Sequence, residues 1–546
     1  MQAARAVAAD DEIAAAEAVD CVANLVAKSL VTADSGGARV RYRLLETTRA
    51  YALEKLVEAG EFDAVARRHA RRYLDIFAAA EAEAETRPTD EWLADYVPRM
   101  DNLRAALDWA FTPDGDASLG VTLTAAAVPL WVHLSLMEEC RNRVEQALSA
   151  LAPGAGRDPR CEMKLHAALG ASQVHTGAVT VPEIGAAWRR ALEIAESLDD
   201  AEYQLRSLLG LWFLQTASGR HRAARALAQG FCTLAAKRPD PNDLLIGERM
   251  IGISQYYLGD HSSARRRLEQ VLAHYVPVAQ KSHIIRFQSD QQVPAHVVLA
   301  RVLWLLGLPD QAMRAAESSI ADARAANHTN SLCYALSQAA CPIALLVGDL
   351  AAAEHYVEML LDHSTSHALA LWQAWGRSHQ GVLVIKRGHP ATGLRLLRAG
   401  LNQLGEAKFA ALRLVTFLMA EALARAGQIA DGLAMIEEAI ARSEHSEEHW
   451  LIAELSRVKG ELLLLQGAPG AAEAAEGHFL QALDGARQQG ALSWELRAAT
   501  SLARLLSDRG RSADATALLQ PVYDRFTEGF ATADLKVAKA LLADLS

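Results

Sequence analysis

The chain has 546 residues, 51% of them apolar and 22% charged, which excludes disorder along its whole length and predicts more than one compact unit. Its net charge of −11 is unlike that of a dedicated nucleic-acid binder, whose binding domain is normally basic. Six scattered cysteines without a C-x-x-C pair favour buried thiols in a reducing compartment over a disulfide framework or a zinc site.

The first 60 residues predict a helix, a β-hairpin and a second helix. Residues 11–28 have helical spacing, Ala-Asp-Ser-Gly-Gly at 33–37 is a turn signal, and residues 40–45 alternate as a strand does. A further helix is expected over 46–60, ending at a glycine. This order is that of the latter half of a winged helix, so we expect a partial winged-helix domain over residues 1–60.

Two surface properties follow for this domain. Its hairpin region carries four arginines, but residues 1–60 have seven basic against nine acidic side chains, so we expect no direct contact with nucleic acid. Cutting a winged helix in half would also leave apolar residues without their usual cover. The residues concerned are Ile13, Val22, Leu25 and Val26.

Residues 61–157 predict a helical linker region. The segment 101–111 is strongly amphipathic. The uncharged stretch 117–137 is long enough to cross a membrane, but its glycine, proline and hydroxyl residues favour a buried helix. The N-terminus has three consecutive acidic residues and no apolar core, so it is not a signal peptide. We therefore expect a cytoplasmic protein without a membrane partner.

Residues 158–546 contain an internal repeat of about 40 residues. Glycines recur at intervals of 39 to 48 residues, a small residue stands five positions after each, and another stands seven positions before all but one. A glycine suits the left-handed end of a helix, and small residues let two helices approach closely. The glycines are Gly219, Gly259, Gly307, Gly348, Gly388, Gly427, Gly467 and Gly510.

Each repeat therefore predicts a helical hairpin, and the fold class is an all-α solenoid behind the N-terminal hairpin. A small side chain at a helix crossing should be buried. This applies to Ala224, Ala264, Ala312, Ala353, Ala472 and Ala515.

The first helix of each hairpin should line a concave groove. Offsets of 13, 10, 6, 3 and 2 residues before each turn glycine select eight basic residues and only four acidic ones. The basic residues are Arg206, Arg249, Arg301, Lys386, Arg425, Arg457, Arg497 and Arg504, and the aromatic residues among them are Phe213, Tyr256, Tyr257, Trp304 and Trp375. Such a groove would receive a protein or a small acidic ligand. Alternatively, these arginines pair with carboxylates of neighbouring helices.

No catalytic site is predicted. The chain has no G-x-x-x-x-G-K-[ST] loop and no G-x-S-x-G motif, so ATP binding and serine hydrolysis are not expected. The glycine-rich segment 467–477 has no Lys, Ser or Thr in phosphate-binding position. Residues 445–449 match H-x-x-E-H, but no third ligand stands nearby, and the position between two repeats favours a polar loop. We expect no enzyme activity, cofactor or metal.

The repeat resembles the tetratricopeptide repeat, whose small-residue, turn-glycine and alanine positions stand at the same offsets. Its period of about 40 departs from the roughly 34 residues of that family, so its helices or loops must be longer. The resemblance implies a helical solenoid that binds peptides, proteins or small molecules.

A second resemblance spans nearly the whole chain. The segments LVAKSLV (25–31), RYRLLETTRAYALEKL (41–56) and ARRHARRYL (66–74) are similar to the junction between the winged helix and the helical repeats of STAND-type ATPases in large bacterial transcriptional regulators. The resemblance implies a non-enzymatic sensor module, whose partners include an ATPase and DNA-binding module. Segments 490–506 and 521–530 are equally similar to tails of ATPases fused to adenylate/guanylate cyclases. A regulatory tail of that kind and a free-standing scaffold remain alternatives.

Overall fold

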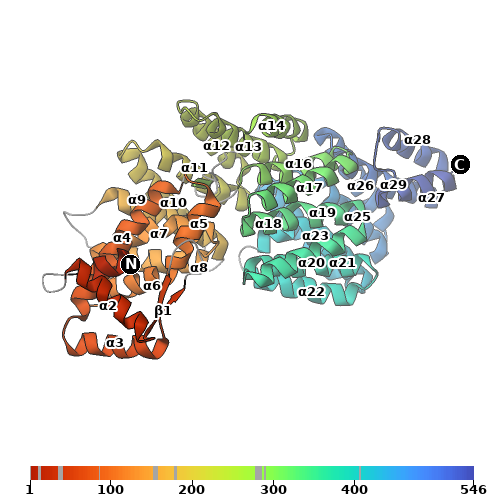
Figure 1. Cartoon of the computed structure of the whole chain (residues 1–546). Helices are drawn as coiled ribbons and strands as arrows, with labels where there is room; N and C mark the ends of the chain where they lie inside the picture. The colour runs from red at the N-terminus through yellow and green to blue at the C-terminus, as the bar shows by residue number, and fades with distance from the viewer. Residues whose placement is uncertain are drawn as a thin grey trace. The chain divides into compact units, whose positions relative to one another are not determined.

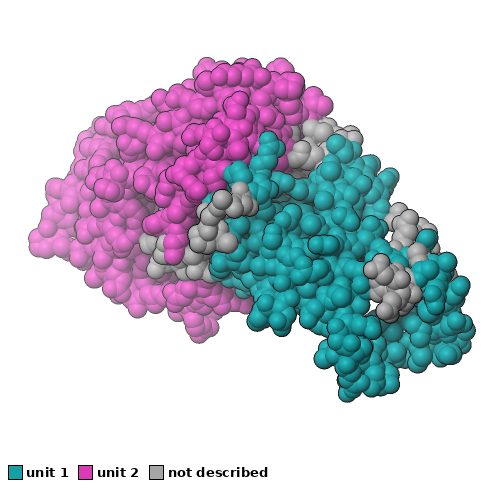
Figure 2. Space-filling model, turned by 90° about the vertical axis from the view of Figure 1, so that its left-hand side faces the viewer, with its two compact units in different colours: residues 1–169, 279–285 teal, residues 170–278, 286–546 magenta. Residues whose placement is uncertain are grey.

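A computed structural model describes residues 2–9, 14–34, 41–84, 86–151, 158–176, 181–276, 286–287, 290–404 and 408–545. These residues fall into two compact units, unit 1 up to Leu169 and unit 2 from Gly170 onward (Figure 2). The boundaries expected from the sequence, after residues 60 and 157, remain predictions.

Unit 1 is helical apart from one hairpin (Figure 1). Its elements are α1 (Gln2–Ala8), α2 (Ala15–Ala27), β1 (Val31–Asp34), β2 (Arg41–Leu44), α3 (Glu46–Glu58), α4 (Phe62–Glu83), α5 (Thr89–Tyr96), a short 3-10 turn (Val97–Arg99), α6 (Met100–Ala110), α7 (Ala117–His133) and α8 (Met137–Ser149). Helix α9 (Pro159–Thr176) runs from unit 1 into unit 2.

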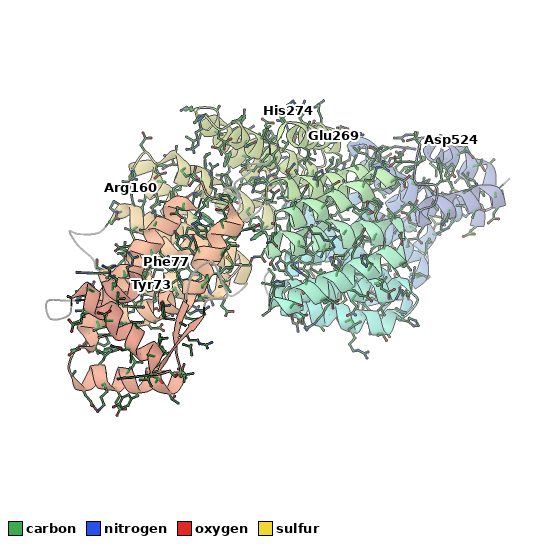
Figure 3. All side chains as sticks on the ribbon, viewed as in Figure 1. Tyr73, Phe77, Arg160, Glu269, His274 and Asp524 are labelled. Atoms are coloured by element: carbon green, nitrogen blue, oxygen red, sulfur yellow. The ribbon has the colours of Figure 1, made fainter. Side chains whose placement is uncertain are left out.

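The core of unit 1 forms around α4 and α7. Tyr73 and Phe77 of α4 (Figure 3) pack there with Trp92, Leu103 and Trp131. The Trp92 indole donates to Ala80 O at 2.9 Å, which satisfies its buried N–H. Most of α7 is buried in this core, as the sequence predicted for this uncharged stretch.

The N-terminal order of helix, hairpin and helix is confirmed, with two corrections. Strands β1 and β2 pair antiparallel from Val31↔Leu44 to Asp34↔Arg41, so the first strand extends into the segment assigned to the turn. The rest of that turn and Ile13 lie outside the described residues. Cys21, expected to be buried, is exposed.

Helix α3 contains no buried residue, and the surrounding surface is rich in exposed apolar side chains. Tyr51 is 61% exposed, Val57 is 62% exposed and Leu25 is 37% exposed. Val22 and Val26 are half-buried. The described part of the N-terminal segment therefore presents apolar surface to solvent.

Unit 2 is a succession of helical hairpins (Figure 1). Its helices are α10 (Val181–Ser197), α11 (Ala201–Ala217), α12 (His221–Ala235), α13 (Pro241–Tyr257), α14 (His261–His274), α16 (Gln292–Leu305), α17 (Pro309–Ala325), α18 (Thr329–Ala335), a π-helical turn (Leu336–Ala340), α19 (Cys341–Val347), α20 (Leu350–Ser366), α21 (Ala370–Lys386), α22 (Pro390–Gln403), α23 (Lys408–Arg425), α24 (Ile429–His445), α25 (Ile452–Gln466), α26 (Ala471–Gln489), α27 (Leu492–Asp508), α28 (Ser512–Tyr523) and α29 (Ala533–Leu545).

The repeat pattern is confirmed residue by residue. All eight turn glycines have positive φ, between 67° and 89°, the region that favours glycine. Five of the six predicted crossing alanines are fully buried, and Ala472 is half-buried. At Gly381 a Cβ would meet Leu397 N at 2.6 Å and Gly393 O at 2.8 Å, because α21 and α22 cross almost backbone to backbone. The fold is an all-α, tetratricopeptide-like solenoid.

The solenoid winds round so that its late repeats pack against the turns of its early ones. Gly219 lies against Ser446, Gly259 against Gln489, Gly307 against Leu492 and Gly348 against Ala533. The His449 N–H donates to Tyr257 O at 3.0 Å, and Gln311 donates to Glu528 from both its backbone and its side chain. The interior of unit 2 is consequently filled by its own helices.

Of the described residues, one helical stretch is long and apolar enough to span a membrane. It is Thr329–Val347, with a mean hydropathy of 1.4, and 78% of the tested segment is buried. It comprises α18, the π-helical turn and α19, which pack between α17 and α20, so we describe it as a core helix of unit 2.

Candidate functional site

The thirteen residues selected from the sequence divide into three groups by exposure. Arg249, Tyr256, Arg301, Trp304, Trp375 and Arg457 are buried, Arg206, Tyr257, Lys386 and Arg497 are half-buried, and Phe213, Arg425 and Arg504 are exposed. The interior positions come from first helices of successive hairpins: α11, α13, α16, α21, α25 and α27.

Two of the interior arginines are neutralised by carboxylates. Arg457 contacts Glu454 at 2.8 Å and Glu421 at 2.9 Å, and Arg497 contacts Glu454 at 2.9 Å and Asp534 at 2.7 Å. Burial opposes ionisation of Glu454, but the two guanidinium groups outweigh it and lower its pKa. These ion pairs join α23, α25, α27 and α29.

Two more basic residues have acidic neighbours. Arg206 bonds to Glu202 at 2.8 Å, a carboxylate that Arg238 and Arg286 also contact at 2.8 Å. Burial would raise the pKa of Glu202, but these arginines lower it to about 2. Burial lowers the pKa of Lys386, and the Arg497 charge lowers it further.

Arg249 and Arg301 are different. Among the described residues, neither guanidinium has a carboxylate oxygen within 4.0 Å. Arg249 donates to Gln291 Oε1 at 2.7 Å and lies 5.5 Å from the centre of the Trp212 ring. Burial lowers its pKa to about 10. Both arginines influence the pKa of Tyr334, which burial raises, so they lie in one region of the interior.

A π-helical turn prepares the surroundings of Arg301. The Cys341 N–H donates to Leu336 O, five residues back, so Ser337 O loses its usual donor four residues ahead. Pro342 has no N–H, so Gln338 O loses its usual donor as well. Two consecutive carbonyls are thereby free to accept bonds from other helices.

Those bonds come from α16 and α21. Arg301 Nε donates to Gln338 O at 2.7 Å, and its Nη2 donates to Gln338 Oε1 at 2.8 Å. His379 Nε2 donates to Ser337 O at 2.8 Å, which leaves Nδ1 as an acceptor. Nδ1 has no partner among the described residues. Burial lowers the pKa of His379 to about 4, so the ring is neutral at pH 7.

A cavity of about 30 Å³ lies beside these two side chains. Its aromatic walls are Trp304, Trp450 and Trp494, and the Trp304 and Trp494 rings meet edge to face at 4.6 Å. The remaining lining is aliphatic apart from Phe417: Leu305, Pro342, Leu345, Leu346, Val382, Val415 and Leu418. The site thus joins one cation, one neutral acceptor and an apolar chamber the size of a small ion.

The sequence selected Arg301 and Trp304 but missed His379, Trp450 and Trp494. His379 stands nine residues before its turn glycine, and Trp450 and Trp494 precede the helices that the offsets cover. One signal was available: Pro342 lies inside a continuous apolar segment, and a proline inside a helix frees a carbonyl four residues earlier.

The H-x-x-E-H match has a structural use. Glu448 is buried beside His221, with 3.8 Å between Oε1 and Nε2, and Trp450 is buried against Tyr256. The segment is therefore a contact between early and late repeats, which corrects the expectation of a polar loop. Within the described residues, no group of three His, Cys, Asp or Glu side chains could hold a metal.

Comparisons with known proteins point to transcriptional regulation. The chain is 39% identical over 143 residues to proteins named as HTH-type transcriptional regulators in Mycobacterium bovis and Mycobacterium tuberculosis, and the match covers 26% of this chain. The chain spans only 15% of the length of those relatives. It is also 26% identical over 401 residues to an uncharacterised Rhizobium meliloti protein, covering 70% of this chain and 38% of that protein. No protein-family model matches the chain.

Two solved structures resemble the chain at low identity. A Rap protein complexed with competence and sporulation factor has a TM-score of 0.39 at 10% identity, covering 78% of this chain and 99% of that chain. A monomeric mutant of IFIT1 with Gppp-AAAA has a TM-score of 0.38 at 13% identity, covering 86% and 99%. At these scores, the fold assignment rests on the hairpins of this chain themselves.

Proposed function

We propose that the chain is the signal-receiving module of a bacterial transcriptional regulator and acts without catalysis. The observation that carries this proposal is the 39% identity to HTH-type regulators. The solenoid architecture agrees with it, since stacked helical hairpins bind ligands and partners along their inner surface.

The proposal extends to the finer points of the resemblance. The helix, hairpin and helix at residues 15–58 would be the end of a winged helix of a STAND-type ATPase. The ATPase and DNA-binding module would be partners of this chain in the cytoplasm. The exposed apolar surface at α3 suits a domain contact.

The receiving surface would be the basic interior of unit 2. Of the selected residues, Arg249 and Arg301 combine burial with the absence of a carboxylate partner among the described residues. A guanidinium in a low-dielectric interior binds an anion more strongly than one in water. A protein side chain or a small acidic ligand that reaches this interior would shift the packing of the early repeats against the late ones.

Transcript profiling tests the proposal. Deleting the coding sequence for this chain should change a defined set of transcripts, and the variant R249Q/R301Q should reproduce that change. The control R425Q/R504Q removes two exposed arginines chosen by the same offsets and should behave as wild type at equal protein abundance. A deletion strain with a wild-type transcript profile would refute a regulatory role.

A further inference from the structure

We propose that the cavity beside Arg301 and His379 binds a small carboxylate that also carries a hydrogen-bond donor, in the manner of a 2-hydroxy acid. This inference rests on the proposed function, because it names the chemical class of the signal. It depends on three observations: an uncompensated guanidinium, an unpaired ring nitrogen and the size of the chamber.

The guanidinium requires an anion. Arg301 is 6% exposed, and a buried charge is stable only when it is paired. Elsewhere in unit 2 the protein supplies the partner itself, as at Arg457 and Arg497. At Arg301 it supplies only the two oxygens of Gln338, which fix the plane of the guanidinium but carry no charge. A carboxylate is the planar anion that fits a guanidinium best.

The histidine requires a donor. His379 Nε2 is committed to Ser337 O, and Nδ1 is a buried acceptor without a partner among the described residues. A buried, unsatisfied polar atom is destabilising. A carboxylate alone cannot satisfy it, since both of its oxygens are acceptors. A hydroxyl next to the carboxylate can donate to Nδ1 while the carboxylate contacts Arg301.

The chamber limits the ligand to a few atoms. Its volume of about 30 Å³ is near the share of one water molecule in the liquid, and its walls are indole and aliphatic groups. A nucleotide, a phosphopeptide or a dicarboxylate would place bulk or further charge against these walls. A two- to three-carbon acid places only a methyl-sized group there.

Calorimetric titration of the full chain in chloride-free buffer tests the inference. The probes are glycolate, acetate and acetamide. Glycolate should bind most tightly, acetate roughly tenfold more weakly because it leaves Nδ1 unsatisfied, and acetamide should not bind detectably. Tryptophan fluorescence provides a readout on the wild-type protein alone, since Trp304, Trp450 and Trp494 line the chamber.

Two variants separate the roles of the two side chains. R301Q should weaken glycolate and acetate at least tenfold, whereas the exposed R504Q should bind both as wild type does. H379F should bring glycolate down to the affinity of acetate and leave acetate unchanged. Equal binding of acetamide and acetate by wild type, or wild-type glycolate affinity in R301Q, would overturn the inference.

The outcome is separable from that of the proposed function. Loss of regulated transcripts on deletion, without carboxylate binding in vitro, removes this inference and leaves the regulatory role. Carboxylate binding without any transcript change removes the regulatory role and leaves the site.

Discussion

Arg457 and Arg301 are both buried arginines on first helices of their hairpins, yet only one is neutralised. Arg457 lies among Glu454, Glu421 and Glu461, whereas Arg301 bonds to the uncharged Gln338. Removing the first leaves buried carboxylates short of a counter-charge. Removing the second also removes an uncompensated charge, which offsets the hydrogen bonds that are lost.

The two arginines should therefore respond differently to the same substitution. We expect R457M to lower the free energy of unfolding by about 3 kcal/mol, and R301M to change it by about 1 kcal/mol or less. Urea denaturation of the two variants under identical buffer conditions checks this. Equal losses would mean that Arg301 has a counter-charge after all.

Two buried histidines give the fold a dependence on pH. Burial lowers the pKa of both His261 and His379 to about 4 from the ordinary 6.5. Between pH 6.5 and 4 the unfolded chain binds protons at these positions and the folded chain does not, so stability falls as the pH falls through that window. Above pH 6.5 the two residues contribute no slope.

Denaturation midpoints measured at pH 7, 5.5 and 4.5 should fall steadily, and replacing His261 and His379 by Phe should flatten the trend. The exposed His274 (Figure 3) is the control, since H274F should keep the wild-type slope. An unchanged slope in the double variant would show that the loss of stability at acid pH arises elsewhere.

The element scale is where the sequence was most informative. Turn geometry and helix crossings are local, so Gly348 and Ala353 each reveal their environment through residue type alone. The π-helical turn was missed because its cause is distributed. Pro342 frees the Gln338 carbonyl, but the donor that captures it, Arg301, lies 37 residues away.

Crossing positions make a matched pair for mutation. Ala353 is fully buried, whereas Ala472 at the equivalent repeat position is half-buried. We expect A353L to cost about 2–3 kcal/mol through overpacking, and A472L to cost under about 1 kcal/mol. Thermal or urea unfolding of both variants decides the point, and a larger loss in A472L would contradict the assignment of repeat positions.

Pro342 makes a second prediction at this scale. In P342A the new N–H competes for the Gln338 carbonyl, so Arg301 loses its acceptor while the helix gains a regular bond. Stability should stay level or rise, and glycolate affinity should fall by at least about threefold. A variant that is less stable but binds glycolate normally would show that the turn serves packing alone.

At the scale of the whole unit, the sequence predicted a solenoid but not that its late repeats close against its early ones. Contacts such as Gln311 with Glu528 and Trp304 with Trp494 join residues about 190 to 220 positions apart. Superhelical pitch depends on small rotations summed over many hairpins, so no local pattern encodes it. For the same reason, an open groove and a filled interior looked identical in sequence.

Closure should make distant repeats unfold together. E528A removes both acceptors of Gln311, so we expect faster hydrogen exchange in the first turn of α17 as well as in α28 and α29. The exposed Asp524, labelled in Figure 3, gives the control D524A, which should leave α17 protected. Faster exchange confined to α28 and α29 would show that the two ends are not coupled.

The central claim is that the interior holds an anion at its uncompensated arginine. The most direct measurement is anomalous diffraction from crystals of the full chain soaked in bromide, a spherical anion small enough for the cavity. We predict a peak in contact with the Arg301 guanidinium and none at Arg457 or Arg497. Bromide found only at exposed arginines such as Arg425 and Arg504, with the cavity empty, would contradict the account.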